Sequence, residues 1–588
     1  MRTSYPRTPH LPWSPGATAD DVRTGSLEGF AGREVVVTEK LDGENTTLYA
    51  DGLHARSLDS AHHPSRAWVK GLQGRIAARV PAGWRVCGEN VYARHSIAYT
   101  GLESWFYGFS VWDGDGRCLD WDRTVAFLRR LGIPTPPVLW RGTFDERALR
   151  ALRLDTGRQE GYVVRTVEGF GYAEFGRRVA KWVRPRHVTT DAHWMYAAVV
   201  ENGLGPRAAL WDVRSGATPD PEALAAAVGL PQGGDAGAAS DGAPDGAADV
   251  SSDVAADVVA DIVADVAARL DGLGLGRSGD DRLAGVLAAL LHRHPRARLA
   301  ARLAAPLGMP LARRVADLVG LYPGLHRPYP DEERRTGLLR LSYAADLGVL
   351  HAVAAALADT AEAREQVEWS ALHAEEARPL DGLREAFRDV DDPDAADRCV
   401  AQAREAYARG RIATAEEAVA ATWRWRSGGF PRLVHLVGPS GSGKSTFGRR
   451  LPGMGAGAGV AAYVSLDELR AARGARSDQR DNGAVLREGL DRLDTALAAG
   501  GTVVWDATSL NPHQRSLVHA VAHRRDALVT HAVALVDEAE LARRNAHRTH
   551  AVPPEVLAGQ LRRFVPPYPG QAHRTWYVGA SGTVEDEA

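Results

Sequence analysis

Cysteine is scarce in this sequence. The 588 residues include three cysteines, Cys87, Cys118 and Cys399, which are far apart in the chain. This excludes a disulfide-stabilised scaffold and a cysteine-rich zinc site, and it fits a reducing cytosol. The chain also lacks an uninterrupted apolar run approaching the roughly 20 residues that span a bilayer. Its opening segment, MRTSYPRTPHLPWSPG, has no apolar core of a secretory signal. We therefore expect a cytoplasmic protein with no membrane partner.

A strong charge of either sign is also missing, because the formal net charge is -3. This argues against a basic protein that wraps duplex DNA, although local basic patches can still bind a phosphate backbone. Hydrophobic residues make up 45% of the chain, which is enough for several buried cores. At about 150 residues per domain, the length indicates three or four domains.

Composition and periodicity divide the chain into four parts. Residues 1–213 mix strand-like runs such as EVVVTEKL and EGYVVRTV with turns, which predicts an α+β domain with antiparallel sheets. Residues 214–279 are rich in Gly, Ala, Asp and Ser and are predicted to form a low-complexity linker. Residues 280–428 have helical periodicity, which predicts an all-α domain. Residues 429–588 alternate short apolar strands with helices, the pattern of an α/β domain with a parallel sheet.

The most specific motif is GPSGSGKS, which fits the pattern G-x-x-x-x-G-K-[ST]. It follows the apolar strand RLVHLV and opens a helix, so both flanks of a phosphate-binding loop are present. Backbone N–H groups at such a helix start bind phosphates. Lys444 would then reach the β- and γ-phosphates of ATP, and the Ser445 hydroxyl would hold Mg²⁺. The predicted nucleotide-binding residues are Gly438, Gly441, Gly443, Lys444, Ser445 and Thr446.

Two later strands end in aspartates. YVSLDELR places Asp467 at a strand end with Arg470 one helical turn later, and VVWDATSL places Asp506 at another strand end. Ligands of parallel α/β sheets bind at the carboxyl ends of strands, where an aspartate can accept the proton of an attacking hydroxyl. The segment LARRNAHRTHAVPPEVLAGQL fits either a lid over the phosphates or an ordinary solvated helix. Its arginines are Arg543, Arg544 and Arg548.

Over residues 432–572 this region resembles the P-loop polynucleotide 5'-hydroxyl kinases. The resemblance implies that Asp467 is the base on the 5'-hydroxyl and that Arg470 contacts the adjoining phosphate of the acceptor. It also implies that Arg548 or a neighbouring lid arginine stabilises the transition state. Small-molecule kinases share the loop, so a small-molecule acceptor stays open. The remaining residues assigned in this way are Arg515 and Arg544 for the acceptor and Asp506 for the metal.

A second region of interest is VTEKLDGENTTLYA, in which Lys40 precedes Asp42 and Gly43. A nucleophilic lysine must lose its proton, and partial burial or nearby cations can lower its pKa. A glycine lets the chain turn tightly against a ligand. The pattern K-x-D-G is short, however, and it also fits a surface hairpin.

Further motifs follow it in the sequence. They supply Arg56 in HARSLDS, Glu89 in VCGENVYAR, Phe109 in WFYGFSVWD, Glu160 in QEGYVVR and Lys181 in RRVAKWVR. In this order and spacing, residues 33–188 resemble the covalent nucleotidyltransferase superfamily, and most of all its ATP-dependent RNA ligases. The resemblance implies that Lys40 attacks the α-phosphorus of ATP, expels pyrophosphate and carries AMP. The AMP passes to a 5'-phosphate and departs when a 3'-hydroxyl attacks, so one difficult joining step becomes several easier ones.

The same resemblance assigns roles to the other residues. Glu160 would bind a metal, Glu89 would contact the ribose or a metal-bound water, and Phe109 would stack on adenine. The remaining assignments are Lys181 for the α-phosphate, Asp42 and Gly43 for the nucleotide, Arg56 for the phosphate of the end being sealed, and Asn45 for the substrate.

The last ligase motif departs from the family pattern. Many relatives have two lysines separated by one residue, whereas this chain has Val179, Ala180 and Lys181. Arg177 and Arg178 are the candidates to replace the missing lysine. The departure affects the prediction of strand sealing more than that of self-adenylylation.

The helical part is faintly similar to the later helices of HD phosphohydrolases. That family binds its metals with an adjacent His-Asp pair, and no His-Asp dipeptide occurs in the chain. We therefore interpret the block as a degenerate or purely structural helical domain. Its histidines are scattered at His292, His294, His326 and His351.

These motifs together predict an RNA repair enzyme. A kinase that makes 5'-phosphates and a ligase that uses them fit one pathway, with ATP and Mg²⁺ or Mn²⁺ at both sites. The expected partners are RNA ends, with cleaved tRNA as a natural example, and a separate enzyme that heals 3' ends. The alternatives are a DNA-end or small-nucleotide kinase fused to a capping-like nucleotidyltransferase, and a kinase whose inactive ligase-like domain binds RNA or senses nucleotide.

Overall fold

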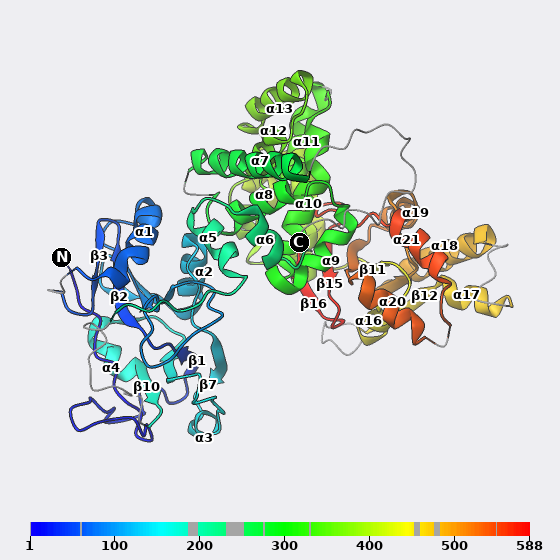
Figure 1. The fold of residues 1–588 in the computed structure, drawn as a ribbon. Helices are drawn as coiled ribbons and strands as arrows, with labels where there is room; N and C mark the ends of the chain where they lie inside the picture. The colour runs from blue at the N-terminus through cyan, green and yellow to red at the C-terminus, as the bar shows by residue number, and fades with distance from the viewer. Residues whose placement is uncertain are drawn as a thin grey trace. The chain divides into compact units, whose positions relative to one another are not determined.

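The structure is a computed structural model with two compact units, Met1–Leu290 and Leu291–Ala588 (Figure 1). The described residues are 2–58, 62–185, 198–230, 252–274, 277–328, 331–451, 459–474, 482–548 and 550–588.

The N-terminal unit contains two antiparallel sheets, as predicted. The first has the order β10-β8-β1-β7 and consists of β1 (Glu34–Lys40), β7 (Val138–Thr143), β8 (Gly161–Thr166) and β10 (Val179–Val183). The second has the order β3-β2-β4-β5-β6-β9 and consists of β2 (Glu44–Tyr49), β3 (Gly52–Ala55), β4 (Arg85–Asn90), β5 (Phe106–Trp112), β6 (Arg117–Cys118) and β9 (Phe170–Gly171). The turn after Lys40 leads directly from the first sheet into the second.

Strand burial explains why these runs form sheets. In β1, Val35, Val36 and Val37 are fully buried, as expected of a central strand covered on both faces. The helices of this unit are α1 (Ala67–Ile76), α2 (Trp121–Leu131), α3 (Glu146–Arg150), α4 (Phe175–Arg178), α5 (Ala208–Ser215), α6 (Pro221–Ala227), α7 (Ser252–Gly272) and α8 (Asp280–Leu290).

The segment predicted as a linker, residues 214–279, contains regular structure. Helices α6 and α7 lie within it, and α7 packs against α8 inside the N-terminal unit. Alanine is the strongest helix former, so an Ala-rich segment can be helical despite its low complexity. Residues 231–251, the most Gly-rich part of the prediction, lie outside the described residues.

The C-terminal unit begins with a block of helices, as predicted. They are α9 (Arg296–Leu307), α10 (Met309–Leu325), α11 (Asp331–Ser342), α12 (Leu347–Ala356), α13 (Ala361–Ala374), α14 (Pro393–Ala408) and α15 (Ala415–Ala421). No described helix is long and apolar enough by itself to cross a membrane, and the bent pair Arg334–Ser342 and Leu347–Ala356, at 105°, passes that length and composition test together.

A mostly parallel sheet follows, in the order β12-β13-β11-β14-β15-β16, and only β16 runs antiparallel to its neighbour. Its strands are β11 (Arg432–Val437), β12 (Val460–Ser465), β13 (Thr502–Asp506), β14 (Leu528–Ala534), β15 (Arg574–Val578) and β16 (Val584–Glu587). The accompanying helices are α16 (Lys444–Arg450), α17 (Leu466–Ala472), α18 (Asn482–Ala498), α19 (Pro512–Arg524), α20 (Glu538–Ala546) and α21 (Pro554–Arg563). The predicted fold class is confirmed in all three parts.

Ion pairs join the helical block to the sheet. Arg432 of β11 pairs with Asp392 at 2.9 Å and also with Asp394, and Arg574 of β15 pairs with Asp394 at 2.9 Å. All of these side chains are at least partly shielded from solvent, which makes such pairs stronger than exposed ones. The block and the sheet therefore form one folded body.

Candidate functional site

The N-terminal unit has a cavity of about 520 Å³ between its two sheets. Lys40 ends β1 there, opposite Gly161 in the neighbouring strand β8. This register brings Glu160 next to Lys40, although 120 residues separate them in the sequence. Of the residues predicted for this site, those that line the cavity are Lys40, Gly43, Asn45, Arg56, Glu89, Phe109 and Lys181.

Lys40 donates a short hydrogen bond to the Glu160 carboxylate, and both side chains are largely buried. Burial favours the neutral amine and lowers its pKa, but the nearby charges of Glu160 and Glu89 outweigh burial and leave the pKa raised. The lowered Lys40 pKa that a nucleophile needs is therefore absent from the protein without bound ligands. The amine is held as an ammonium group by the carboxylates.

Glu89 lies on β4 opposite Asn45 of β2. Burial raises its pKa to about 8, with the Lys40 charge lowering it and Glu160 raising it further. Glu89 thus ionises reluctantly beside Lys40 and Glu160, and a further cation would favour its charged form. Hard oxygen ligands of this kind suit Mg²⁺ or Mn²⁺.

Asp42 binds backbone N–H groups, and Gly43 packs closely against β4. The Asp42 carboxylate accepts backbone N–H groups from Ser96 at 2.7 Å and Ile97 at 2.9 Å, so it orders the loop that carries His95. A Cβ on Gly43 would lie 2.5 Å from the Asn90 carbonyl oxygen. Glycine is required there by close contact with β4, and the same contact brings Lys40 near Glu89.

The polar and aromatic cavity lining suits a nucleotide. The carboxamide oxygen of Asn45 is buried and has no hydrogen-bond partner among the described residues. Phe109 of β5 contacts the Tyr5 ring edge-on, with centroids 5.2 Å apart. A flat base can pack against such rings, and the unsatisfied Asn45 oxygen can accept a hydrogen bond from a ligand.

Position 179 faces this cavity together with Lys181, because alternate residues of β10 point the same way. The missing second lysine is therefore a missing charge inside the cavity. Arg178 pairs with Glu174 at 3.1 Å, and Arg177 is exposed, so neither guanidinium lines the cavity among the described residues. The lowered pKa of Lys181 comes mainly from burial and then from the Lys40 charge.

Sequence reasoning missed several cavity residues. Tyr5 comes from the N-terminal segment, His95 from an irregular loop, and Arg165 from β8. Arg165 donates to the carbonyl oxygens of Phe109 at 2.8 Å and Leu119 at 3.1 Å. No local motif marks these residues, and only the tertiary fold brings them to the cavity.

The second site is the loop between β11 and α16. Gly441 and Gly443 both have φ of +86°, a left-handed conformation that side chains rarely adopt. The backbone N–H of Ser440 donates to the Gln560 side chain of α21 at 2.8 Å, which braces the loop. The loop leads into α16, where Lys444, Ser445 and Thr446 form the first turn. This is the anion-binding geometry that the motif predicts.

Polar side chains gather at the carboxyl ends of β12 and β13. The Ser445 hydroxyl donates to Asp506 at 3.1 Å, and the Tyr463 hydroxyl donates to the other carboxylate oxygen at 2.8 Å. Burial, and then the Asp506 charge, raise the pKa of Tyr463, so it stays a donor. Burial lowers the pKa of Lys444, partly offset by Asp506 and Asp467. Ser445 and Asp506 supply oxygen ligands that fit Mg²⁺, and Tyr463 is a contact that the sequence did not reveal.

Asp467 and Arg470 lie on α17. The Asp467 side chain is 64% exposed and pairs with Arg470 at 2.7 Å. Arg470 also donates to Asn482 at 3.0 Å. The pair is therefore open to an acceptor that approaches the end of the sheet.

The three predicted lid arginines differ in how close they lie to the phosphate-binding loop. Arg544 pairs with Glu540 at 2.6 Å and donates to the Ala580 carbonyl at 2.7 Å, and its guanidinium lies beside Gly443. The charge of Arg548 lowers the pKa of Lys444, so Arg548 is also near the loop. Arg543 pairs with Glu540 and is mostly exposed.

Arg515, predicted to bind substrate, is buried in the fold. It is 3% exposed, and it donates to the carbonyl oxygens of Ser509 at 3.2 Å and Val565 at 2.9 Å. Burial lowers its pKa to about 10. These contacts give Arg515 a part in the packing of α19 and separate it from the open face near Asp467.

The histidines of the helical block have structural contacts. His351 is bonded to the Leu347 carbonyl at 2.6 Å and the Ser370 hydroxyl at 2.9 Å, and His326 is bonded to the Ala354 carbonyl at 2.8 Å. Among the described residues, no group of possible metal ligands includes His292, His294, His326 or His351.

Two family models match this chain. Residues 33–183 match the RNA ligase family, and residues 433–567 match the AAA domain family. One part of the chain is thus similar to RNA ligases, and another part is a P-loop kinase-like region. The two matched segments contain Lys40 and the phosphate-binding loop, respectively.

Several solved structures are similar to parts of this chain. A gluconokinase from Sinorhizobium meliloti 1021 is 24% identical, with 26% of this chain and 84% of that chain covered and a TM-score of 0.20. A Naegleria gruberi RNA ligase variant with AMP and Mn is 18% identical, with 27% and 52% covered and a TM-score of 0.21. An archaeal ATP-dependent RNA ligase is 14% identical, with 38% and 52% covered and a TM-score of 0.22.

The chain spans about half the length of each of these two RNA ligases. No curated protein matches the chain. The family matches therefore support the two domain types.

Proposed function

We propose that this protein repairs RNA by phosphorylating 5'-hydroxyl ends with ATP and sealing them to 3'-hydroxyl ends through a lysyl-AMP intermediate. The observation that carries the proposal is the Lys40 amine, paired with Glu160 at the wall of a nucleotide-sized cavity. The ligase domain and the kinase-like domain supply consecutive steps, because the product of one reaction is the substrate of the other.

In the ligase cavity, the neutral Lys40 amine attacks the α-phosphorus of ATP, and pyrophosphate leaves. The nitrogen loses its proton and forms a phosphoramidate bond to AMP. Glu160 and Glu89 would hold a divalent cation, which would supply charge neutralisation for the phosphates. Phe109 and Tyr5 orient the base, and Lys181 balances charge at the α-phosphate.

The AMP is then transferred to the 5'-phosphate of an RNA end, and the 3'-hydroxyl of a second end displaces it. Arg56 is exposed at the edge of the cavity after β3, a position from which it can bind the phosphate of an incoming end. Asn45 would contact the substrate through its unsatisfied oxygen.

In the kinase-like domain, Lys444 and the loop N–H groups bind the ATP phosphates, and Ser445 with Asp506 would hold Mg²⁺. Asp467 accepts the proton of the 5'-hydroxyl, and Arg470 holds the adjoining phosphate. Arg544 and Arg548 neutralise charge on the transferred phosphoryl group. The substrate is an RNA end such as that of a cleaved tRNA, and a separate enzyme prepares 3' ends.

A second function also has an observation behind it. Val179 occupies a cavity-facing position where many relatives have lysine, and the Lys40 pKa is raised. Both features would suit a ligase-like domain that binds nucleotide or RNA without turnover, beside an active kinase.

Mass measurement of the intact protein separates the two functions. Untreated protein is first exposed to pyrophosphate to remove any bound AMP and is then incubated with ATP and Mg²⁺. We expect wild type to gain one AMP and Lys40→Ala to gain none, while both phosphorylate a 5'-hydroxyl RNA. Absence of the gain in wild type would leave the kinase as the only proposed activity.

Sealing then needs both halves. A nicked RNA duplex with 5'-hydroxyl and 3'-hydroxyl ends should be joined by wild type with ATP, and by neither Lys40→Ala nor Lys444→Ala alone. A mixture of the two variants should restore joining. If a pre-phosphorylated nick is not joined by wild type either, the ligase half forms lysyl-AMP without sealing RNA.

A further inference from the structure

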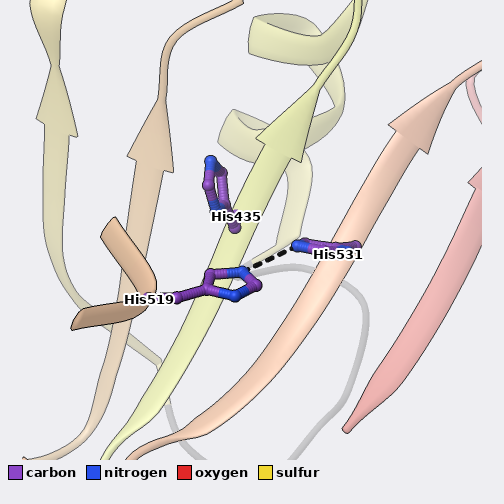
Figure 2. Close-up of side chains that lie close together, drawn as sticks. All are labelled: His435, His519 and His531. Atoms are coloured by element: carbon purple, nitrogen blue, oxygen red, sulfur yellow. Dashed lines mark hydrogen bonds between the residues drawn. The ribbon is translucent and has the colours of Figure 1, made fainter. Parts of the chain in front are cut away.

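The core of the kinase-like domain contains three histidines at positions where apolar side chains would be expected. His435 lies on β11, His531 on β14 and His519 on α19 (Figure 2). His435 and His531 are direct neighbours in the parallel register and are fully buried. Residues paired in this way point to the same face of the sheet, here the face covered by α19.

The ring nitrogens of this histidine trio converge. One nitrogen from each ring lies within 4.8 Å of the other two, and the Nε2 atoms of His519 and His531 are 2.8 Å apart. His435 Nε2 is bonded to the Ser509 hydroxyl at 2.8 Å. The Nδ1 atoms of His435 and His531 are buried and have no hydrogen-bond partner among the described residues. Buried polar atoms without partners in a native core point to an ion or water at the site.

The protonation state also suits a metal. Burial holds the pKa of His435 and His531 well below the ordinary value, and burial with the Arg515 charge lowers that of His519 to about 4. All three rings are therefore neutral at physiological pH, and only the neutral imidazole offers a lone pair to a metal. The Arg515 charge opposes a dication, so the affinity has to come from the nitrogen–metal bonds.

We propose that His435, His519 and His531 bind one divalent transition-metal ion of the Zn²⁺ class. Zn²⁺ bonds to imidazole at about 2.0–2.1 Å, so nitrogens around it are roughly 3.4 Å apart. Ring movements of about 1 Å bring the trio to that spacing. Three protein ligands leave a fourth position for water or for the nearby Ser509 hydroxyl. Mg²⁺ prefers oxygen ligands, which separates this site from the one at Ser445 and Asp506.

The bound ion would join three elements of the domain. His435 precedes Gly438 of the phosphate-binding loop by three residues, and the Gly438 N–H donates to the Thr508 carbonyl beside Ser509. A metal on the trio would thus fix β11, β14 and α19 behind the nucleotide site. The site is structural, and it reaches the phosphates only through the backbone.

The test uses untagged full-length protein, because an affinity tag of histidines would bind the same metals. Wild type, His519→Ala and the control His351→Ala are loaded with Zn²⁺ in excess Mg²⁺, desalted, and analysed for metal content. His519 is the least buried of the trio, and His351 is a buried histidine whose two nitrogens are both bonded in the helical block. We expect wild type and His351→Ala to retain one more Zn²⁺ per chain than His519→Ala.

Cobalt provides a readout that needs no variant. Co²⁺ in a nitrogen-ligated site of this kind should give visible absorption bands in wild type, and added Zn²⁺ should abolish them. Zn²⁺ should also raise the Tm of the kinase-like domain in wild type by at least about 4 °C. Equal Zn²⁺ retention by wild type and His519→Ala, or a wild type without cobalt bands, would overturn the proposal and identify the trio as a neutral hydrogen-bonded cluster.

Discussion

The two proposed nucleotide sites each contain a lysine, and the surroundings of the two lysines shift the pKa in opposite directions. Lys40 faces the Glu160 and Glu89 carboxylates, whose charges outweigh burial and raise its pKa. Lys444 lies in the phosphate-binding loop, where burial outweighs its acidic neighbours and lowers the pKa. The proposed nucleophile is thus the lysine that holds its proton more tightly.

This contrast shows how the two sites depend on their ligands. In the ligase cavity, ATP and a cation on Glu160 and Glu89 would compensate the negative charge that keeps Lys40 protonated. In the kinase-like domain, the phosphates of ATP would supply the negative charge that Lys444 needs to stay charged. The charge state of each lysine would therefore depend on whether the nucleotide is bound.

Reciprocal substitutions test the separation of the two sites and should have the largest effects. Lys40→Ala should lower lysyl-AMP formation more than about 1,000-fold, because no other group at that position can form the bond. Lys444→Ala should lower 5'-phosphorylation about 100- to 1,000-fold, because a phosphate contact is lost. Radiolabelled ATP measures both reactions. Each variant should retain the other activity, and loss of both activities in one variant would contradict independent sites.

The carboxylate behind the phosphate-binding loop comes next in expected effect. Asp506→Asn should lower phosphorylation about 10- to 100-fold and raise the Mg²⁺ concentration needed, because Asp506 orients Ser445 as a metal ligand. Tyr463→Phe removes one hydrogen bond to the same carboxylate and should cost about 3- to 10-fold. A Mg²⁺ titration of initial rates checks both. Unchanged metal dependence in Asp506→Asn would show that the cation binds elsewhere.

The pH dependence should differ between the two sites. A raised Lys40 pKa means that its neutral fraction increases with pH, so single-turnover self-adenylylation should rise about tenfold per pH unit between roughly pH 6 and 8. Phosphorylation should be nearly flat over the same range, because Lys444 acts as a charge and transfers no proton. Quenched-flow measurements at saturating ATP and Mg²⁺ give both profiles. A flat adenylylation profile would mean that the bound nucleotide has already lowered the Lys40 pKa below this range.

The smallest effect is expected at the missing lysine. Val179→Lys should speed sealing of a pre-phosphorylated nick about two- to fivefold, because position 179 faces the cavity beside Lys181. Val179→Met is the matched control for size, and it should not speed sealing. Both variants should lower the Tm slightly, since Val179 is 3% exposed. Equal rates in the two variants would show that the second lysine is not needed here.

The parts of the protein that could be predicted were those encoded by adjacent residues. The phosphate-binding loop is one run of the sequence, and its glycines have the conformation that the motif requires. The pairing of Lys40 with Glu160 depends on the register of β1 and β8, which residue patterns do not determine. The resemblance to RNA ligases assigns the two residues to one site, and strand pairing brings them together in the protein.

Other features depended on contacts that no motif marks. Tyr463 reaches Asp506 from a different strand, and Arg515 looks like an exposed arginine of a helix until its burial is known. The helices α6 and α7 were not predicted, because their composition is typical of a linker. Alanine-rich segments can combine low complexity with high helix propensity. The histidine trio arises from the register of β11 and β14 and from the packing of α19 against the sheet.

The ion pairs between the helical block and the sheet determine where the protein can be cut into stable fragments. A fragment starting at residue 429 would keep Arg432 and Arg574 but discard Asp392 and Asp394. Two guanidinium groups at the amino ends of β11 and β15 would then lose these carboxylates. The compact unit that keeps these pairs is Leu291–Ala588, in which the helical block packs against the sheet. Chimeras in which the kinase-like domain is exchanged should therefore have their junction before the helical block, near residue 291.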